Sequence, residues 1–373
     1  MVVTATTENE QAARGRVRRL DPTRDMGAIA QLIDTAFGDD MDRQGRAALR
    51  DMRWMSRLSP LVWWWAQADP SFRETYNGFV WEEVEGGRPQ RAAPRAGEGG
   101  QPQRVAPTAG EGRGTVVGNA NLMISPGSRY RWVICNVVVR EDYRRQGIAR
   151  RLMEETIEEA RRQGAEEAVL QVYQDNLPAL RLYTDLGFQQ LSGEMGLHLA
   201  AIEAVEAVDA PGYELRPYQP SSAGGRAAYD LANLAVPTAQ QWLKPVRVME
   251  YEPDWGTRVG GKLAALVAGR RSYRLMAFKG TEPAALLSIE ASLRRQMHSL
   301  KLLIHPKHRG QLEPMLVSRA LSMLAGLPGK GVQATVFTDH SGAIQALGQY
   351  GFREKRTLLT MSYRLAKRGA GDE

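Results

Sequence analysis

Apolar positions in the first part of the chain alternate between the spacing of strands and the spacing of helices. The stretch RVRRLDP from Arg16 is predicted to be an extended strand. Apolar residues at helical spacing follow over 26–37, before Gly38. Apolar residues that recur every three or four positions predict an amphipathic helix, and a following glycine predicts its end. The segments NGFVWEEVE, from Asn77, and TVVGNANLMI, from Thr115, then read as strands.

The middle of the chain continues the alternation with short connections. The pattern predicts strands over 131–139 and 168–173 and helices over 148–163 and 177–186. Asn176 is suited to cap the last of these helices, with Pro178 in its first turn and Gly187 after its end. Strands and helices in this order predict an α/β layout, whose first domain ends near Asp209.

The second half repeats this order. After Gly212 come YELRPYQP, an Ala-rich helix, several strands with LKLLIHP among them, a helix near 314–324, the strand VQATVF and a helix that ends at Gly351. Aligning VVVREDYRR with LLIHPKHRG pairs Arg144 with Arg309. One register slip later, Gly187 pairs with Gly351. We therefore expect two diverged copies of one α/β (α+β mixed sheet) fold, over 1–209 and 210–373.

Two segments lie outside this pattern. Residues 86–114 hold the imperfect tandem repeat PQRAAPRAGEG and PQRVAPTAGEG, which is too rich in Gly, Pro and Arg to form a core. Since strand-like sequence resumes afterwards, we interpret it as an expanded hairpin loop, with a surface insertion favoured over a catalytic lid. Trp54 and the run 63–65 either wall an acceptor pocket or pack against a second domain or a partner chain, and the packing role is favoured.

Composition narrows the class of protein. The chain has 373 residues, 43% hydrophobic and 24% charged, which fits a globular protein with two cores. Its net charge of +7 comes mostly from scattered arginines, so an anionic small ligand explains it as well as nucleic acid does. The single cysteine, Cys135, and the absence of an apolar leader or spanning run predict a cytoplasmic protein without membrane contact.

The turn from the 131–139 strand into the next helix carries candidate chemistry. Free backbone N–H groups and the helix dipole favour an anion at such a turn. Gly147 and Ala149 are small enough for a phosphate to approach the backbone, and Arg144, Arg145 and Arg150 add positive charge. Taken alone, these residues fit an ordinary strand-to-helix turn with a solvated arginine face as well as they fit an anion-binding turn.

Two motifs together resemble the GNAT superfamily of N-acetyltransferases. Arg144-Arg145-Gln146-Gly147-Ile148-Ala149 is similar to its signature Arg/Gln-x-x-Gly-x-Gly/Ala, and the run NLPALRLYTDLGF from Asn176 is similar to Asn-x-x-Ala-x-x-x-Tyr-x-x-x-Gly-Phe. The resemblance covers about residues 16–200, and its specific part is 131–188. It implies tandem GNAT-like domains, each with a mixed, mostly antiparallel central sheet flanked by helices.

The resemblance also implies residue roles. Acetyl-coenzyme A is the implied co-substrate, without a metal, and Tyr183 occupies the place of the general acid that protonates the departing thiolate. A role in which Tyr183 only packs beneath the cofactor is the alternative. The implied cofactor-binding residues are Val137, Val138 and Val139 for pantetheine, Arg144, Arg145, Gln146, Gly147, Ile148, Ala149 and Arg150 for the pyrophosphate, and Asn176.

The expected mechanism is direct attack of a primary amine on the thioester, with the oxyanion stabilised by a backbone N–H of 137–139. Cys135 is an unsuitable nucleophile because no histidine precedes His198 to activate it. The general base is open among Glu82, Glu83, Glu85 and a water chain.

The second copy lacks the matching chemistry. Leu312 and Pro314 stand opposite Gly147 and Ala149, and Leu347 stands opposite Tyr183. We therefore expect one active copy, the first, and a degenerate second copy in which His305, His308 and His340 lie exposed in loops and bind no metal.

The expected function is N-acetyl transfer to an amine of unknown identity, by a monomer or homodimer. An acyl-coenzyme A sensor without turnover is the alternative. Nucleic-acid binding through the repeat loop is not expected, because that loop has no aromatic side chains for stacking.

Overall fold

A computed structural model of the chain describes residues 15–38, 77–83, 114–220, 222–294 and 296–365, with four isolated positions between 46 and 53. The tryptophans at 54 and 63–65 and the 86–114 insertion, apart from Gly114, lie outside the described residues. Contacts divide the chain into two compact units, which are described separately. The first is Met1–Ile124, Tyr130–Ala168 and Leu365–Glu373, and the second is Ser125–Arg129 and Val169–Arg364.

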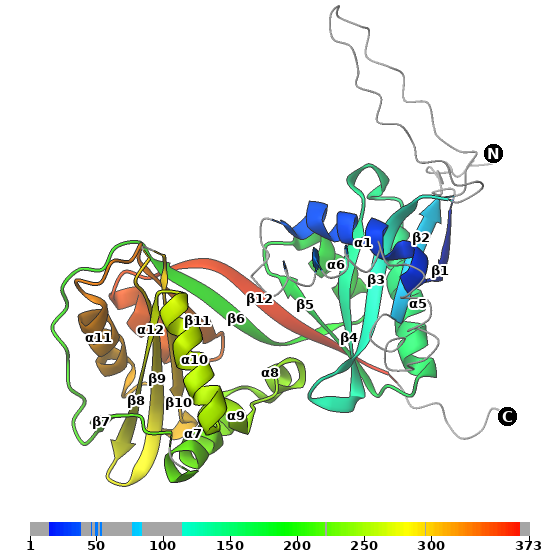
Figure 1. The fold of residues 1–373 in the computed structure, drawn as a ribbon. Helices are drawn as coiled ribbons and strands as arrows, with labels where there is room; N and C mark the ends of the chain where they lie inside the picture. The colour runs from blue at the N-terminus through cyan, green and yellow to red at the C-terminus, as the bar shows by residue number, and fades with distance from the viewer. Residues whose placement is uncertain are drawn as a thin grey trace, which may run out of the picture. The chain divides into compact units, whose positions relative to one another are not determined.

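The first unit is a sheet with a helix on each face (Figure 1). Its strands run in the order β1-β2-β3-β4, and β1 with β2 and β2 with β3 are antiparallel. Its elements are β1 Gly15–Arg19, α1 Pro22–Phe37, β2 Asn77–Glu83, β3 Val116–Ser125, β4 Ser128–Val139, the 3-10 turn η2 Glu141–Tyr143, α5 Ile148–Arg162 and the first residues of β5 Glu167–Tyr173.

Side chains on β2 show which helix covers which face. Val80 packs in a cluster with Met26 and Ile29 of α1. Phe79 and Trp81, its neighbours along the strand, pack in another cluster with residues of α5. Because successive strand residues point to opposite faces, α1 and α5 cover opposite faces of the sheet. We call these the α1 face and the α5 face.

The second unit holds one run of strands in the order β5-β12-β6-β11-β10-β9-β8-β7. Strands β10 and β11 are parallel, whereas β6 is antiparallel to both β11 and β12. Its remaining elements are α6 Leu177–Asp185, β6 Gln189–Leu199, β7 Glu214–Pro217, α7 Ser222–Ala235, α8 Thr238–Leu243, α9 Val248–Tyr251, α10 Trp255–Val267, β8 Arg270–Lys279, β9 Glu282–Ser292, β10 His298–Ile304, the 3-10 turn η3 Pro306–His308, α11 Glu313–Leu324, β11 Val332–Phe337, α12 Ser341–Gln349 and β12 Arg353–Arg364.

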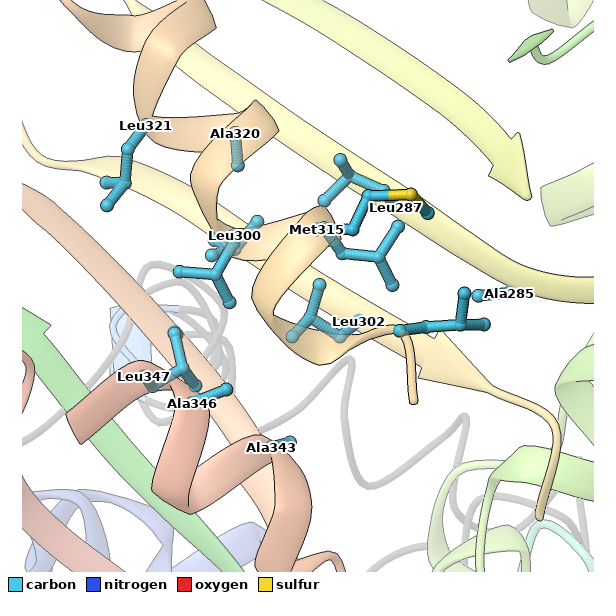
Figure 2. Packing of buried hydrophobic residues seen from close by; sticks show 14 of the residues in the cluster. Ala285, Leu287, Leu300, Leu302, Met315, Ala320, Leu321, Ala343, Ala346 and Leu347 are labelled. Atoms are coloured by element: carbon cyan, nitrogen blue, oxygen red, sulfur yellow. The ribbon is translucent and has the colours of Figure 1, made fainter. Parts of the chain in front are cut away.

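The main core of the second unit lies between its strands and the helices α11 and α12. Leu287 of β9 and Leu300 of β10 face Met315 of α11, with Ala343 and Leu347 of α12 beside them (Figure 2). Such buried side chains each stabilise the fold by roughly 1.5–3 kcal/mol relative to exposure. The interior is closely packed around α11, whose N-cap residue is Leu312.

The structure confirms the predicted mixed, mostly antiparallel α/β architecture. The strand predicted over 131–139 begins three residues earlier, and the helices predicted over 148–163 and 177–186 each end one residue sooner. These boundaries follow from local chemistry. The Asn176 side chain accepts a hydrogen bond from Ala179 N at 3.3 Å, and Gly187 has a φ of +94° after the helix.

The sequence pattern did not predict which strands pair at the junction of the two copies. β6, from the first half, lies between β12 and β11 of the second half. β12 in turn borders β5, where Gln174 N donates to Thr357 O at 2.9 Å. We call this arrangement the strand exchange. Because of it, the compact units do not coincide with residues 1–209 and 210–373, which stay a prediction about the repeats.

The internal repeat itself is visible in the backbone. The turns η2 and η3 follow β4 and β10 at equivalent places, and α5 and α11 begin at aligned residues. Positive φ angles recur at the aligned pair Arg145 and Gly310, +62° and +82°, and at the pair Gly187 and Gly351, +94° and +83°. Both halves therefore fold the same local structures from diverged sequences.

The strand exchange is held in part by a buried amide on α8. Gln240 is 2% exposed, and its Nε2 donates to Ser192 Oγ of β6 and Thr360 Oγ1 of β12, each at 3.1 Å. Gln240→Leu leaves both hydroxyls without this partner, so we expect the free energy of unfolding to fall by about 1–3 kcal/mol. Urea unfolding measures the loss, with Gln190→Leu at an exposed position of β6 as the control. Equal stability of the two variants would contradict this role.

Candidate active site

The turn between β4 and α5 has an unusual backbone. Arg145 and Gly147 have φ angles of +62° and +76°, the left-handed region that side chains disfavour. A Cβ atom added to Gly147 would meet no heavy atom within 4 Å, so the residue faces open space. Gly147 is left-handed and directly precedes Ile148, the first residue of α5. Adjacent left- and right-handed residues turn their N–H groups toward one point. The turn is thus shaped to receive an anion.

The start of α5 lacks the side-chain cap that α1, α6 and α10 have. Asp21 caps α1 and Asn176 caps α6, but Gly147 offers no side chain, and no acidic residue occupies the first turn of α5. The N–H groups of that first turn carry the positive end of the helix dipole. An external anion is the partner that satisfies them best.

Positive side chains surround this turn unevenly. Arg144, Arg145 and Gln146 are exposed, and Arg144 Nε donates to Val139 O at 3.2 Å. Arg150 is half-buried. The guanidinium of Arg151, in the first turn of α5, lies over the Trp81 ring at 5.7 Å. Arg144 and Arg145 are therefore the cations that the turn itself presents.

The side chains of β4 switch between the two faces of the sheet just before this turn. Cys135 Sγ lies 3.9 Å from Met123 Sδ of β3. Two residues later Val137 packs with the α5 cluster, whereas Val138 belongs to the α1 cluster. Asn136, between them, has a φ of +53°. A positive φ inside a strand marks a bulge, which reorients the peptide groups over 137–139.

The second predicted motif lies in the second unit. Asn176 caps α6, and Tyr183 of that helix is 6% exposed. Its ring lies 6.0 Å from the Phe188 ring, which lies 5.5 Å from Tyr363. Burial raises the pKa of Tyr183 to about 12, so the phenol keeps its proton at neutral pH.

The predicted site residues are thus divided between the two units. Residues 137–139 and 144–150 belong to the first unit, and Asn176 and Tyr183 belong to the second. Within each unit the motif forms the local structure that the sequence predicts. The joint action of the two motifs on one cofactor stays a prediction.

Glu82, one of the candidate bases, is held by arginines. It is 4% exposed and forms ion pairs with Arg16, Arg18 and Arg24. Burial alone would raise the pKa of Glu82, but hydrogen bonds and charge from Arg18 and its neighbours lower it overall. A carboxylate stabilised in this way is a poor proton acceptor, so Glu82 is better explained as a structural group.

Glu83 and Glu85 differ in what the structure says of them. Burial and a hydrogen bond to Glu83 raise the pKa of Tyr143, and the Tyr143 ring lies under the Arg140 guanidinium at 4.4 Å. Glu83 therefore has a partner beside the β4–α5 turn. Glu85 lies outside the described residues.

Cys135 is unsuited to nucleophilic chemistry. Burial raises the pKa of its thiol to about 12. A thiol attacks as its thiolate, which is then scarce at neutral pH. Direct attack by the amine stays a prediction.

The expectation that His305, His308 and His340 lie exposed is wrong for two of them. His308 and His340 are each 5% exposed. His308 Nδ1 lies 3.0 Å from Tyr213 Oη, and His340 Nε2 lies 2.8 Å from Glu313 Oε1. His308 is the last residue of η3, and His340 is the N-cap of α12. No group of acidic, His or Cys side chains within the described residues is arranged to hold a metal.

The β4–α5 turn aligns with the turn between β10 and α11 in the second copy. That second turn contains a carboxylate of its own. Glu313, 1% exposed, accepts hydrogen bonds from Gly310 N at 2.7 Å and Leu312 N at 3.0 Å. Leu312, aligned with Gly147, has a φ of −109°. The alignment of the two halves predicted the loss of the anion site from Leu312 and Pro314, but not from Glu313. An acidic residue in place of Ile148 was the available signal.

Known proteins share this fold and part of this sequence. Residues 61–188 match the profile of the Acetyltransferase (GNAT) family. No curated protein gives a significant sequence match. A GCN5-related N-acetyltransferase from Sphaerobacter thermophilus is similar in structure, with a TM-score of 0.54 and 16% identity over 94% of this chain and 96% of that one.

Two further solved structures are similar. A GCN5-related glucosamine N-acetyltransferase region of a fungal multi-domain GH3 β-N-acetylglucosaminidase has a TM-score of 0.53 and 13% identity, over 95% of this chain and 38% of that one. A tandem GNAT protein from the clavulanic acid biosynthesis pathway has a TM-score of 0.49 and 17% identity, over 94% and 98%.

Residues 61–188 thus carry a segment of the GNAT acetyltransferase family, and the fold is similar to that of a solved GCN5-related N-acetyltransferase. The GNAT family uses acyl-coenzyme A and acetylates amines. Within the described residues, every helix is too short or too polar to cross a membrane.

The Glu313 carboxylate gives a pH-dependent prediction. Burial alone would raise the pKa of Glu313, but His340 and Gly310 N lower it overall. A lowered folded-state pKa means stability that is present above the unfolded pKa, about 4.3, and is lost as the pH falls through the folded value. We expect Glu313→Gln to cost about 1.5–3 kcal/mol at pH 7 and less at pH 3.5.

Urea unfolding at both pH values measures this difference. Glu203→Gln, the same change at an exposed position, is the control and should leave stability nearly unchanged at either pH. A Glu313→Gln penalty that does not shrink in acid would contradict an ionised, hydrogen-bonded Glu313.

Proposed function

We propose that the chain is an acetyl-coenzyme A-dependent N-acetyltransferase whose catalytic copy is the first one. The observation that carries the proposal is the β4–α5 turn, with left-handed Arg145 and Gly147 and an uncapped helix start. It lies inside the segment that matches the GNAT family. A pyrophosphate suits this turn because it satisfies several N–H groups at once and is attracted by Arg144 and Arg145.

The cofactor-binding roles follow the order of the chain. Residues 144–150 bind the pyrophosphate, and the backbone of 137–139 pairs with the pantetheine amides as an added strand would. The bulge at Asn136 supports this role because it turns the peptide groups that follow it. Asn176 caps α6 and contacts the cofactor.

The reaction is a single acyl transfer. The lone pair of a neutral amine attacks the thioester carbonyl carbon, and a C–N bond forms. The tetrahedral oxyanion collapses, the C–S bond breaks, and the thiolate takes a proton from the Tyr183 phenol. The amine loses one proton to solvent or to a base, and Tyr183 regains its own from water. The products are the N-acetylated amine and coenzyme A.

The second copy is proposed to be structural. Its anion turn already holds the Glu313 carboxylate, hydrogen-bonded to the N–H groups of Gly310 and Leu312. A buried negative charge there repels a pyrophosphate and leaves it without these donors. Leu347, aligned with Tyr183, is fully buried and has no proton to give. These observations support one active site per chain.

Replacing Gly147 tests the cofactor site. Gly147→Glu adds a strained left-handed side chain and a negative charge where the pyrophosphate is proposed, so we expect acetyl-coenzyme A affinity to fall about 100-fold or more. Isothermal titration measures the dissociation constant. Gly164→Glu is the matched control, because Gly164 also has a positive φ, +78°, and open space around its Cβ, at the other end of α5.

Each result has a clear reading. Retained affinity in Gly164→Glu with loss in Gly147→Glu supports the site. Equal acetyl-coenzyme A affinities in the two variants would show that the turn is not part of the cofactor site. Absence of acetyl-coenzyme A binding to the wild-type protein would reject the proposed function.

Replacing Tyr183 tests the general acid. Tyr183→Phe keeps the packing against Phe188 but removes the proton, so we expect kcat to fall about 100-fold with coenzyme A affinity unchanged. Release of free thiol across a panel of primary amines identifies an acceptor and gives kcat. Tyr363→Phe, in the same aromatic cluster, is the control. Unchanged kcat in Tyr183→Phe would leave the residue a packing role, and binding without turnover by the wild type would indicate a sensor.

A further inference from the structure

A fully buried asparagine on β3 stands beside the bulge of β4. Asn119 is 0% exposed and lies opposite Val80 in the register of β2 and β3. Directly paired residues point to the same face of a sheet, so the Asn119 side chain lies on the α1 face, where Val80 packs. An amide buried at such a position requires an explanation, since apolar residues pack there more favourably.

The orientation of the Asn119 amide is fixed by its partners. Nδ2 donates to the backbone carbonyl of Asn136 at 2.9 Å and to the side-chain oxygen of Asn121. A backbone carbonyl only accepts hydrogen bonds, so a flipped Asn119 would set two oxygens against each other. Both N–H bonds of the amide are therefore used, one of them on the bulge.

The same orientation leaves the other end of the amide unsatisfied. Asn119 Oδ1 is buried and has no hydrogen-bond partner among the described residues. A buried acceptor without a partner costs about 1–3 kcal/mol. Groups that reduce stability in this way occur where function requires the geometry they impose. The contact with Asn136 is the geometry that Asn119 imposes.

Holding the Asn136 carbonyl also sets the direction of the next N–H group. No peptide bond within the described residues is cis, and in a trans peptide the C=O and the following N–H point in opposite directions. The Asn136 carbonyl is directed toward Asn119, so the Val137 N–H is directed away from it. The positive φ of Asn136 makes this peptide plane depart from the strand, and Asn119 keeps it there.

We propose that Asn119 is a positioning residue for acetyl transfer, which holds the 136–137 peptide so that the Val137 N–H is aimed at the thioester oxygen. This rests on the proposed function, and it adds a residue outside both sequence motifs. Asn119 contacts neither cofactor nor substrate. Its effect on the reaction passes through the peptide that it holds, and is largest when the carbonyl oxygen becomes an oxyanion.

Asn119→Asp is the sharpest test. Its carboxylate has nearly the same shape but cannot donate, and it repels the Asn136 carbonyl, so the peptide is expected to rotate. We expect kcat to fall about 10- to 100-fold, less than or equal to the loss of a whole oxyanion donor. The dissociation constant of coenzyme A, which has no thioester oxygen, should change less than about threefold. Asn119→Ala, which removes the donor without adding charge, should act in the same direction.

Infrared spectroscopy of bound [1-13C]acetyl-coenzyme A provides a readout that does not need turnover. A hydrogen bond from the Val137 N–H lowers the stretching frequency of the labelled carbonyl, so the band should move to higher frequency in both Asn119 variants. Val80→Ala is the control, since Val80 is buried directly opposite Asn119 on the same face. It should lower thermal stability while it leaves the band and kcat unchanged.

The outcomes separate this inference from the function on which it rests. If the wild type binds and turns over acetyl-coenzyme A while both Asn119 variants keep its kcat and carbonyl band, Asn119 has no positioning role. The same conclusion follows if Val80→Ala shifts the band and kcat as much as the Asn119 variants do. If the wild type binds no acetyl-coenzyme A, the proposed function fails, and this inference fails with it.

Discussion

The site depends first on a peptide chain that turns left-handed between a strand and a helix. Gly147 adopts a φ of +76° and leaves open space where a side chain would stand. The first turn of α5 begins there without a side-chain cap, so its N–H groups are open to an anion from outside the chain. Every other cofactor contact proposed here follows from placing a pyrophosphate at that point, because it fixes one end of a long, flexible molecule.

The two copies differ at this turn by a small sequence change that supplies an internal anion. The backbone is shared up to Arg145 and Gly310, both left-handed, and it diverges at the helix start. In the second copy the Glu313 carboxylate accepts the hydrogen bonds that an external anion would accept, and His340 Nε2 lies 2.8 Å from it. An internal anion costs no association entropy, so this copy gains stability at the turn where the first copy has its proposed binding site.

Local structure could be predicted from the sequence, and long-range pairing could not. The ends of α1, α5 and α6 follow from caps, glycines and apolar spacing within a few residues. The strand exchange does not, since alternating residues specify two faces of β6 and β12 but not their neighbours in the sheet. The burial of His308 and His340 and the contacts of Glu313 could not be predicted either, because each depends on partners distant in sequence.

Burial determines the chemistry differently for the two groups that bear on the mechanism. It raises the pKa of the Cys135 thiol and of the Tyr183 phenol alike, each to about 12. For a nucleophile this is a loss, because the thiolate is the reactive form. For an acid that must hold a proton until a thiolate departs, it keeps the reactive form fully populated at neutral pH. The same desolvation that disfavours a covalent acetyl-cysteine route is therefore compatible with Tyr183 as the proton donor in direct transfer to an amine.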